Sequence, residues 1–298
     1  MFMNSDCEAY ANQNAYQSYV YAYLLSRIIP SIKECDNVLD VGCGDGKSTD
    51  LLYQTLITTN HDNEFKGSVL GIDLLPPMVE YSRERYCSNL KSLIFAKIDI
   101  ASENASENIL STIKEGYIDH VVSSSCFHWI EDQPKALANL LKVINPGVSS
   151  INLILYYGIV DSANYATVRA LNNQEFSPHL KKLKEFHEGL LLPWRRAWMI
   201  EADPIKAYKK MMIDVGYNED GITIEKLNET KYSFLPSPEV AVNCIQASFP
   251  DVLAEIEKMG LKEKFFRQFI NNMLDYNARY RGNKLTMSFP LMYVRYHS

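Results

Sequence analysis

Short apolar runs alternate with amphipathic segments through the first half of this chain. A short apolar run predicts a buried strand, and apolar residues that recur every three or four positions predict a helix. The runs that predict strands are 38–41, 68–73, 93–100, 119–125 and 149–157. Segments with helical spacing stand before and between them, at 15–29, 47–56, from Pro76 onward and at 134–144. This alternation predicts right-handed βαβ units and a parallel sheet.

The pattern changes after Tyr157, where long polar segments with helical spacing replace the regular alternation. These later segments predict, in order, helical structure over 160–216 that ends in an amphipathic helix at 203–215, a strand at 222–234, two or three helices over 238–277, and a terminal strand at 284–296. The second half therefore adds helices and a few strands to the sheet of the first half.

Length and composition agree with a globular domain of ordinary size. The chain has 298 residues, 47% of them apolar, which is enough to bury a sizeable core. We find no repeat, low-complexity stretch or linker that divides it. We expect a single domain over 1–298, with a core in 1–157 that begins with a lid helix, and helical cap segments plus the final strands in 158–298.

Charge and cysteine usage narrow the class of protein. A net charge of -6 without a long Lys/Arg run gives no electrostatic footprint for nucleic acid, so we expect no such partner. The six cysteines are scattered, which predicts neither a zinc site nor a disulfide framework. We find no apolar run of membrane-spanning length and no signal-peptide profile in 1–11. We expect a cytoplasmic protein, either a monomer or a homodimer.

The stretch 37–46, Asn-Val-Leu-Asp-Val-Gly-Cys-Gly-Asp-Gly, predicts a strand, a tight turn and the start of a helix. The glycines Gly42, Gly44 and Gly46 let a ligand approach the backbone and allow positive φ. Asp40 and Asp45 bring negative charge where a phosphate would need a helix N-terminus without acids. Their G-x-G-x-G spacing also differs from the G-x-G-x-x-G of dinucleotide-binding loops. A polyphosphate is therefore not the expected ligand.

These residues resemble the class I S-adenosylmethionine (SAM) dependent methyltransferases, whose first motif has the form (V/L)LD(V/L)GCGxG. Residues 77–82, Pro-Met-Val-Glu-Tyr-Ser, also fit the (S/P)xxMVxxA phrase that follows the second strand in SAM enzymes. The resemblance implies SAM as cofactor and S-adenosylhomocysteine (SAH) as product. It further implies an α/β fold with a Rossmann-like, doubly wound seven-stranded sheet, its last strand antiparallel, and helical cap insertions.

Acids at the ends of predicted strands are candidates for cofactor contacts. Asp73 ends the second strand, where a carboxylate can accept hydrogen bonds from both hydroxyls of a ribose; it can also cap the helix that begins near Pro76. Asp99 ends the third strand, where the resemblance implies an acceptor for the adenine amino group. Since the carboxyl ends of parallel strands share one crevice, we predict one cofactor pocket. Its candidate residues are Asp40, Gly42, Gly44, Asp73, Leu74, Asp99, Ile100 and Ser124.

Segments 10–17 and 127–133 narrow the resemblance to the juvenile hormone acid O-methyltransferases of insects. Those enzymes methylate the carboxylate of a long apolar acid, and the resemblance implies that Gln17 and Trp129 hold that carboxylate. An amide and an indole N–H are neutral donors, which can orient a carboxylate without pairing it as tightly as an arginine. A carboxylate with a pKa of about 4 is ionised at neutral pH and needs no general base. The expected acceptor is a small apolar carboxylic acid, similar to juvenile hormone acid or farnesoic acid.

Several alternatives stay open for these residues. His128 can act as the base for a hydroxyl or amine acceptor, or it can pack as a structural residue. Trp129 can equally be a core aromatic residue. The run 123–126, Ser-Ser-Ser-Cys, is smaller and more polar than the aromatic-containing run expected in the insect enzymes. Cys43 has no paired base, and neither has Cys126, so nucleophilic catalysis is not expected. Outside enzymes, the alternative is an inactive SAM-binding scaffold.

Overall fold

The computed structural model divides the chain into two compact units, each described here by itself. One unit holds 14–156, 201–226 and 292–298, and the other holds 1–13, 157–200 and 227–291. The residues that the structure describes are 7–59, 65–87, 92–113, 116–157, 197–227, 231–234, 256–276, 279–282, 284–288 and 291–298. Predictions for 160–196 and 238–255 therefore lie outside the described residues. The expectation of a single domain over 1–298 stays a prediction.

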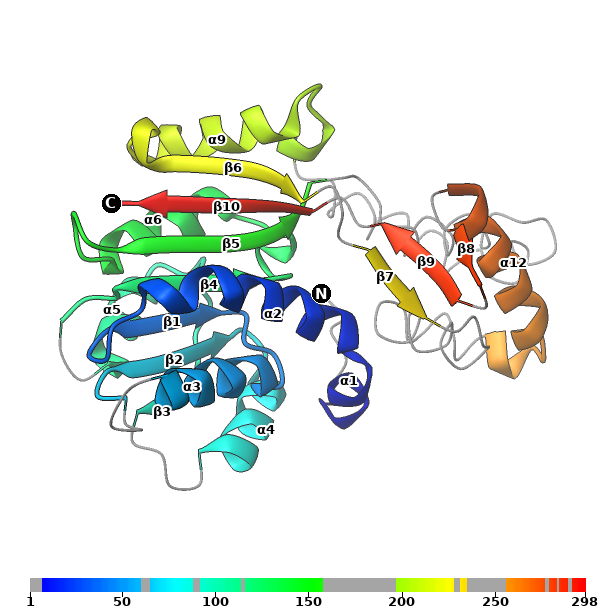
Figure 1. Cartoon of the computed structure of the whole chain (residues 1–298), viewed down its shortest axis with the longest axis horizontal. Helices are drawn as coiled ribbons and strands as arrows, with labels where there is room; N and C mark the ends of the chain where they lie inside the picture. Colours follow the sequence, from blue (N-terminus) through cyan, green and yellow to red (C-terminus); the bar gives the residue numbers. More distant parts are fainter. Residues whose placement is uncertain are drawn as a thin grey trace. The chain divides into compact units, whose positions relative to one another are not determined.

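A seven-stranded sheet forms the centre of the larger unit (Figure 1). Its strands follow the order β3-β2-β1-β4-β5-β10-β6. Their bounds are β1 Asn37–Val41, β2 Ser68–Asp73, β3 Leu93–Lys97, β4 His120–Ser124, β5 Ser150–Tyr156, β6 Ile222–Leu227 and β10 Leu291–His297. The pairs β1 with β2, β1 with β4, β2 with β3 and β4 with β5 are parallel, whereas β10 runs opposite to its neighbours. The predicted doubly wound sheet with an antiparallel last strand is confirmed.

Helices cover both faces of this sheet (Figure 1). Their bounds are α2 Ala15–Ile28, α3 Lys47–Thr59, α4 Pro76–Tyr86, α5 Ala105–Thr112, α6 Gln133–Val143 and α9 Pro204–Val215, with single turns η1 Ile29–Ser31, η2 Phe127–Trp129 and η4 Glu219–Gly221. In one layer α2 contacts β4, β5 and α3, and α3 contacts α4; in the other, α6 contacts both α5 and α9. Because both faces are covered, the central strands are almost wholly buried.

Local sequence signals fix the ends of several helices. The side chain of Asp132 accepts from the backbone N–H of Lys135, and that of Asp203 accepts from Lys206, at 3.0 and 3.1 Å. These helices, α6 and α9, each carry proline in the first turn, where a backbone N–H would have no partner within the helix. Gly216 ends α9 with a φ of 115°, a left-handed cap conformation that glycine adopts without strain.

The smaller unit contains a separate antiparallel sheet of order β7-β9-β8. Its described elements are α1 Cys7–Gln13, η3 Ala197–Ile200, β7 Lys231–Phe234, α12 Lys262–Tyr276, β8 Arg279–Arg281 and β9 Lys284–Ser288. In α12, Phe265 and Phe269 are fully buried. Their spacing of four residues puts them on one helix face, which gives this unit an apolar core of its own.

Two predicted strands need correction, because each is divided between the two sheets. The segment predicted as one strand over 222–234 is β6 in the large sheet and β7 in the small one, and the segment over 284–296 is β9 and β10. The sequence between the halves carries the reason: 228–230 is polar without alternation, and Pro290 has no backbone N–H for a ladder. The third strand also ends at Lys97 rather than at Ile100.

Candidate cofactor and acceptor site

The carboxyl ends of β1 and β4 form the switch point of the large sheet. From β1 the chain continues to β2 on one side and later returns to β4 on the other, so the connections diverge there. In open α/β sheets the ligand crevice lies outside the carboxyl ends of the strands at this point. The segments that follow β1 and β4 are therefore the first place to look for a site.

The loop after β1 requires glycine at two positions for steric reasons. Gly42 has a φ of 80°, and a Cβ on it would lie 2.2 Å from the Sγ atom of Cys126. Gly46 has a φ of 78°, and a Cβ there would lie 2.7 Å from the side chain of Ser82. The hydroxyl of Ser82 donates to the carbonyl of Gly44 at 3.1 Å and braces the loop. The glycine pattern thus creates a close-packed turn.

Asp73, at the end of β2, is bonded to this loop. Its Oδ2 accepts from the backbone N–H of Gly44 at 3.0 Å, and its Oδ1 accepts from that of Leu75 at 2.9 Å. Burial raises the pKa of this carboxyl, while the backbone donors act in the opposite direction. Leu75 is the N-cap residue of α4, and α4 has no side-chain cap bond, so the expected cap role of Asp73 is wrong. Each carboxylate oxygen keeps a second lone pair for a ligand.

Asp40 lies inside the core and is bonded to the helix layer. Its Oδ2 accepts from the hydroxyls of Tyr21 at 2.9 Å and Thr49 at 2.7 Å. Burial is the main cause that raises its pKa to about 6, and the two hydroxyls oppose that rise. Nearby, Asp45 accepts from the amide of Asn14 at 3.0 Å. These bonds fasten α2 to the glycine loop, a connection that the sequence did not reveal because its partners are distant along the chain.

Other predicted cofactor residues lie at the carboxyl ends of β2 and β3, which are neighbours in the sheet. Leu74 is 41% exposed, and Asp99 is exposed with its Oδ1 accepting from the N–H of Ala101 at 2.9 Å. Ile100 is buried, and its carbonyl accepts from the amide of Asn139 at 2.9 Å. The fold brings Asp73, Leu74 and Asp99 together at the carboxyl ends of β2 and β3. Their contacts to a cofactor stay predictions.

The last residue of β4, Ser124, and the next residue, Ser125, have hydroxyls in unusual surroundings. The Oγ atoms of Ser124 and Ser125 are buried and have no hydrogen-bond partner within the part of the chain that the structure describes. Ser125 also has a φ of 58°, in the left-handed region, and its N–H donates to the carbonyl of Ile154 at 2.9 Å. By contrast, the hydroxyl of Ser123 donates to the carbonyl of Val41 at 2.7 Å. Ser125 was not among the predicted site residues, because residue type alone gives no sign of its backbone conformation.

The predicted acceptor residues come from two elements. Gln17 lies on α2 and is partly exposed, and His128 and Trp129 belong to the turn η2. The His128 ring is buried, with its centroid 4.5 Å from that of Tyr156 in an edge-on arrangement and 5.5 Å from that of Trp129. This packing is compatible with both readings of His128.

The two cysteines of this region, Cys43 and Cys126, are poorly suited to nucleophilic catalysis. Burial raises the pKa of the thiols of Cys43 and Cys126, and the negative charges of Asp73 and Asp40 raise both further. Both thiols therefore stay protonated at neutral pH and are poor nucleophiles. Across the described ranges, we find no cluster of three or more His, Cys, Asp or Glu that could hold a metal ion. No described helix combines the length and apolarity required to cross a bilayer.

The chemistry of these residues fits a nucleoside ligand such as SAM. The glycine loop turns tightly at the end of β1, Asp73 keeps acceptor capacity, and the buried hydroxyl of Ser124 has no hydrogen-bond partner among the described residues. Comparison with known proteins agrees with this fit. Residues 39–151 match the family model described as a methyltransferase domain.

Two curated relatives extend the similarity beyond that segment. The chain is 27% identical over 188 residues to the juvenile hormone acid O-methyltransferase of Bombyx mori, covering 61% of this chain and 57% of the relative. It is 23% identical over 257 residues to the enzyme of the same name from Drosophila melanogaster, covering 85% of this chain and 76% of the relative. The aligned part thus spans little more than half of the Bombyx protein.

Solved structures show the fold. A Bacillus halodurans protein superposes with a TM-score of 0.53 at 12% identity, covering 93% of this chain and 97% of the other. Together with the strand order, this likeness shows the fold of a class I methyltransferase, and residues 39–151 match the methyltransferase domain, the type that takes its methyl group from SAM. The similar curated sequences of that class include those of the two insect enzymes.

Proposed function

We propose that this protein transfers the methyl group of SAM to a carboxylate oxygen of a small apolar acid and releases a methyl ester and SAH. The observation that carries the proposal is the similarity to two juvenile hormone acid O-methyltransferases, which extends over 85% of the chain in one case. The name of those relatives states the reaction type, and the local chemistry of the predicted acceptor residues agrees with it.

Gln17 and Trp129 have the chemistry to hold an acceptor carboxylate. Both side chains donate hydrogen bonds without a positive charge, so a carboxylate bound to them keeps its nucleophilicity. An acid with a pKa of about 4 is already ionised at neutral pH, so the residues need only orient it and exclude water. Bound SAM supplies the electrophilic methyl group.

The predicted cofactor residues have distinct roles in this proposal. Asp73 accepts from the ribose hydroxyls with the lone pairs that its two backbone donors leave free. Asp99 accepts from the adenine amino group, and Leu74 and Ile100 flank the adenine ring. Gly42 and Gly44 let the ligand approach the loop backbone. Each assignment is separate, so each can be tested by one substitution.

A second candidate function is methylation of a hydroxyl or amine with His128 as the general base. The observation in its favour is that His128 shares the turn η2 with Trp129, so its ring belongs to the same part of the fold. A base-dependent reaction slows as the imidazole becomes protonated, whereas transfer to a carboxylate keeps its rate down to about pH 5. A pH–rate profile therefore separates the two reactions.

The experiment that tests the proposal is a SAM-consumption screen over short, aromatic and isoprenoid carboxylic acids, with hydroxyl and amine acceptors in parallel. We expect turnover confined to one class of acid. Gln17→Ala and Trp129→Phe should then reduce that turnover more than they reduce SAH affinity. Gln54→Ala, a glutamine exposed on the neighbouring helix α3, is the matched control and should change neither. Turnover of hydroxyl or amine acceptors alone would refute the proposal, and SAH binding without any turnover would favour an inactive scaffold.

A further inference from the structure

The Ser125 position combines two unfavourable features that structure alone does not explain. Its hydroxyl is buried and has no hydrogen-bond partner among the described residues, and its backbone has a φ of 58° although it is not a glycine. A buried hydroxyl without a partner loses its hydration without replacement, and left-handed backbone is strained for residues with a Cβ. Such features cluster at functional sites, where a ligand provides the missing partner.

The surroundings of Ser125 indicate which ligand that is. The next residue, Cys126, packs against Gly42 of the glycine loop. The carbonyl of Cys126 accepts from the N–H of Trp129 at 2.8 Å. This bond closes the turn that carries the predicted carboxylate donor. Ser125 is thus the first residue of the segment 125–129, which contacts the glycine loop through Cys126 and ends at Trp129.

The neighbouring serine shows what an ordinary hydroxyl does here. Ser123 donates to the carbonyl of Val41 at 2.7 Å and ties β4 to β1. Its hydroxyl therefore has a structural role, and removing it should weaken the fold. Ser125 has the same functional group two residues later without any such bond.

We propose that Ser125 is a specificity-determining residue whose hydroxyl donates a hydrogen bond to the carboxylate of the methyl acceptor. The proposal rests on the function proposed above and adds a third neutral donor to Gln17 and Trp129. A hydrogen bond to a charged group is stronger than one between neutral groups, so binding of the acid satisfies the buried hydroxyl. An acceptor without a polar end leaves it unsatisfied and is rejected.

The test measures stability and acceptor binding separately. Ser125→Ala removes a hydroxyl that has no partner, so it should leave the urea midpoint unchanged or raise it, whereas Ser123→Ala should lower it. In calorimetric titration of the SAH-bound protein with farnesoic acid, or with the acid that the screen selects, Ser125→Ala should weaken binding by about 10- to 100-fold. Its SAH affinity should equal that of the wild type.

A second variant keeps the proposal testable if Ser125→Ala fails to fold. Ser125→Gly relieves the left-handed backbone as well as removing the hydroxyl, so it should be at least as stable as the wild type and equally poor in binding the acid. A loss of stability in Ser125→Ala as large as in Ser123→Ala would overturn the proposal, as would unchanged acid affinity or a loss confined to SAH affinity. If the wild type methylates only hydroxyl or amine acceptors, the function proposed above fails, and the same titration with that acceptor shows whether Ser125 still binds it.

Discussion

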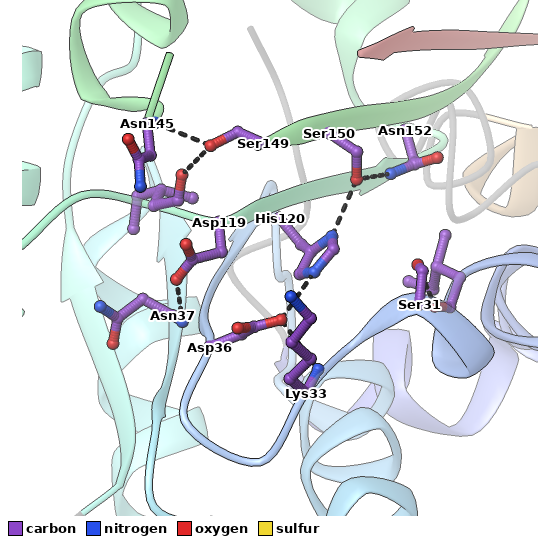
Figure 2. A network of polar contacts seen from close by, with 12 residues as sticks. Ser31, Lys33, Asp36, Asn37, Asp119, His120, Asn145, Ser149, Ser150 and Asn152 are labelled. Atoms are coloured by element: carbon purple, nitrogen blue, oxygen red, sulfur yellow. Dashed lines mark hydrogen bonds and ion pairs between the residues drawn. The ribbon is translucent and has the colours of Figure 1, made fainter. Parts of the chain in front are cut away.

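The amino and carboxyl ends of the large sheet differ in how fully their polar side chains are hydrogen-bonded. At the amino end, the His120 ring lies between two partners, with Nδ1 2.8 Å from the Oγ of Ser150 and Nε2 3.0 Å from the Oδ2 of Asp36 (Figure 2). Ser150 also accepts from the amide of Asn152 at 2.9 Å, and Asn152 accepts from the hydroxyl of Tyr293 at 2.6 Å. A chain of bonds thus links β4, β5 and β10.

The carboxyl end contains bonded side chains such as Asp73, but it also has polar groups that are not bonded. Ser124 and Ser125 have buried hydroxyls for which the described ranges contain no hydrogen-bond partner, and Ser125 has a strained backbone. The glycine loop is left-handed at Gly42, Gly44 and Gly46, so its conformation depends on residues without a Cβ.

This difference separates the end of the sheet that contributes stability from the end where we propose that the ligand binds. A satisfied network rigidifies the amino end, whereas unpaired groups and strained backbone persist only where the rest of the structure, or a ligand, compensates for them. Substitutions at the amino end should therefore change stability and leave ligand binding intact, and substitutions at the carboxyl end should change binding.

The largest effect is expected from Gly42→Ala. The added Cβ meets Cys126 at 2.2 Å and lies on a residue with a φ of 80°, so both steric overlap and backbone strain oppose it. Gly147→Ala is the matched control, because its φ is 84° and nothing lies within 4 Å of the added Cβ. We expect the control to lose about 1–2 kcal/mol from strain alone, and Gly42→Ala to lose more and to bind SAH poorly. Equal losses in urea denaturation would contradict the close packing described above.

The next effect concerns the buried carboxyl of Asp40. Its pKa of about 6 in the folded protein exceeds its ordinary value of 3.8, so the folded state holds the proton more tightly than the unfolded state. Stability should therefore fall as the pH rises from about 4 to about 6, by up to about 3 kcal/mol from this group, and then level off.

Asp40→Asn cannot ionise and should lose this contribution. The difference in unfolding free energy between the variant and the wild type should move in favour of the variant as the pH rises through that window. A difference independent of pH would show that the carboxyl is not held in its protonated form.

A smaller effect is expected from His120→Ala at the amino end. The substitution leaves Asp36 and Ser150 without one partner each and opens a small cavity, which should cost about 2–3 kcal/mol in urea denaturation. The SAH affinity of the folded variant should not change, since the proposed ligand crevice is at the opposite ends of the strands. A large loss of affinity would remove the separation between the two ends.

Much of this fold could be predicted from residue patterns. The apolar runs located β1 to β5, and the glycine spacing of Gly42 to Gly46 located the loop, because these signals are local. The division of 222–234 and 284–296 between two sheets was missed, since alternation does not say which sheet a strand joins. The bond between Tyr21 and Asp40 and the left-handed backbone of Ser125 were missed as well, because both depend on packing between distant segments.

The most direct test of the account is calorimetric titration of SAH into the wild type, Asp73→Ala and Asp119→Ala. The two aspartates are matched, because each accepts a backbone N–H of a segment from a neighbouring strand: Asp73 from Gly44 at the carboxyl end, and Asp119 from Asn37, at 2.8 Å, at the amino end. We predict tight binding to the wild type, a loss of about 10- to 100-fold in Asp73→Ala, and no change in folded Asp119→Ala. No binding to the wild type, or equal losses in both variants, would contradict the claim that the carboxyl end of the sheet is the SAM site.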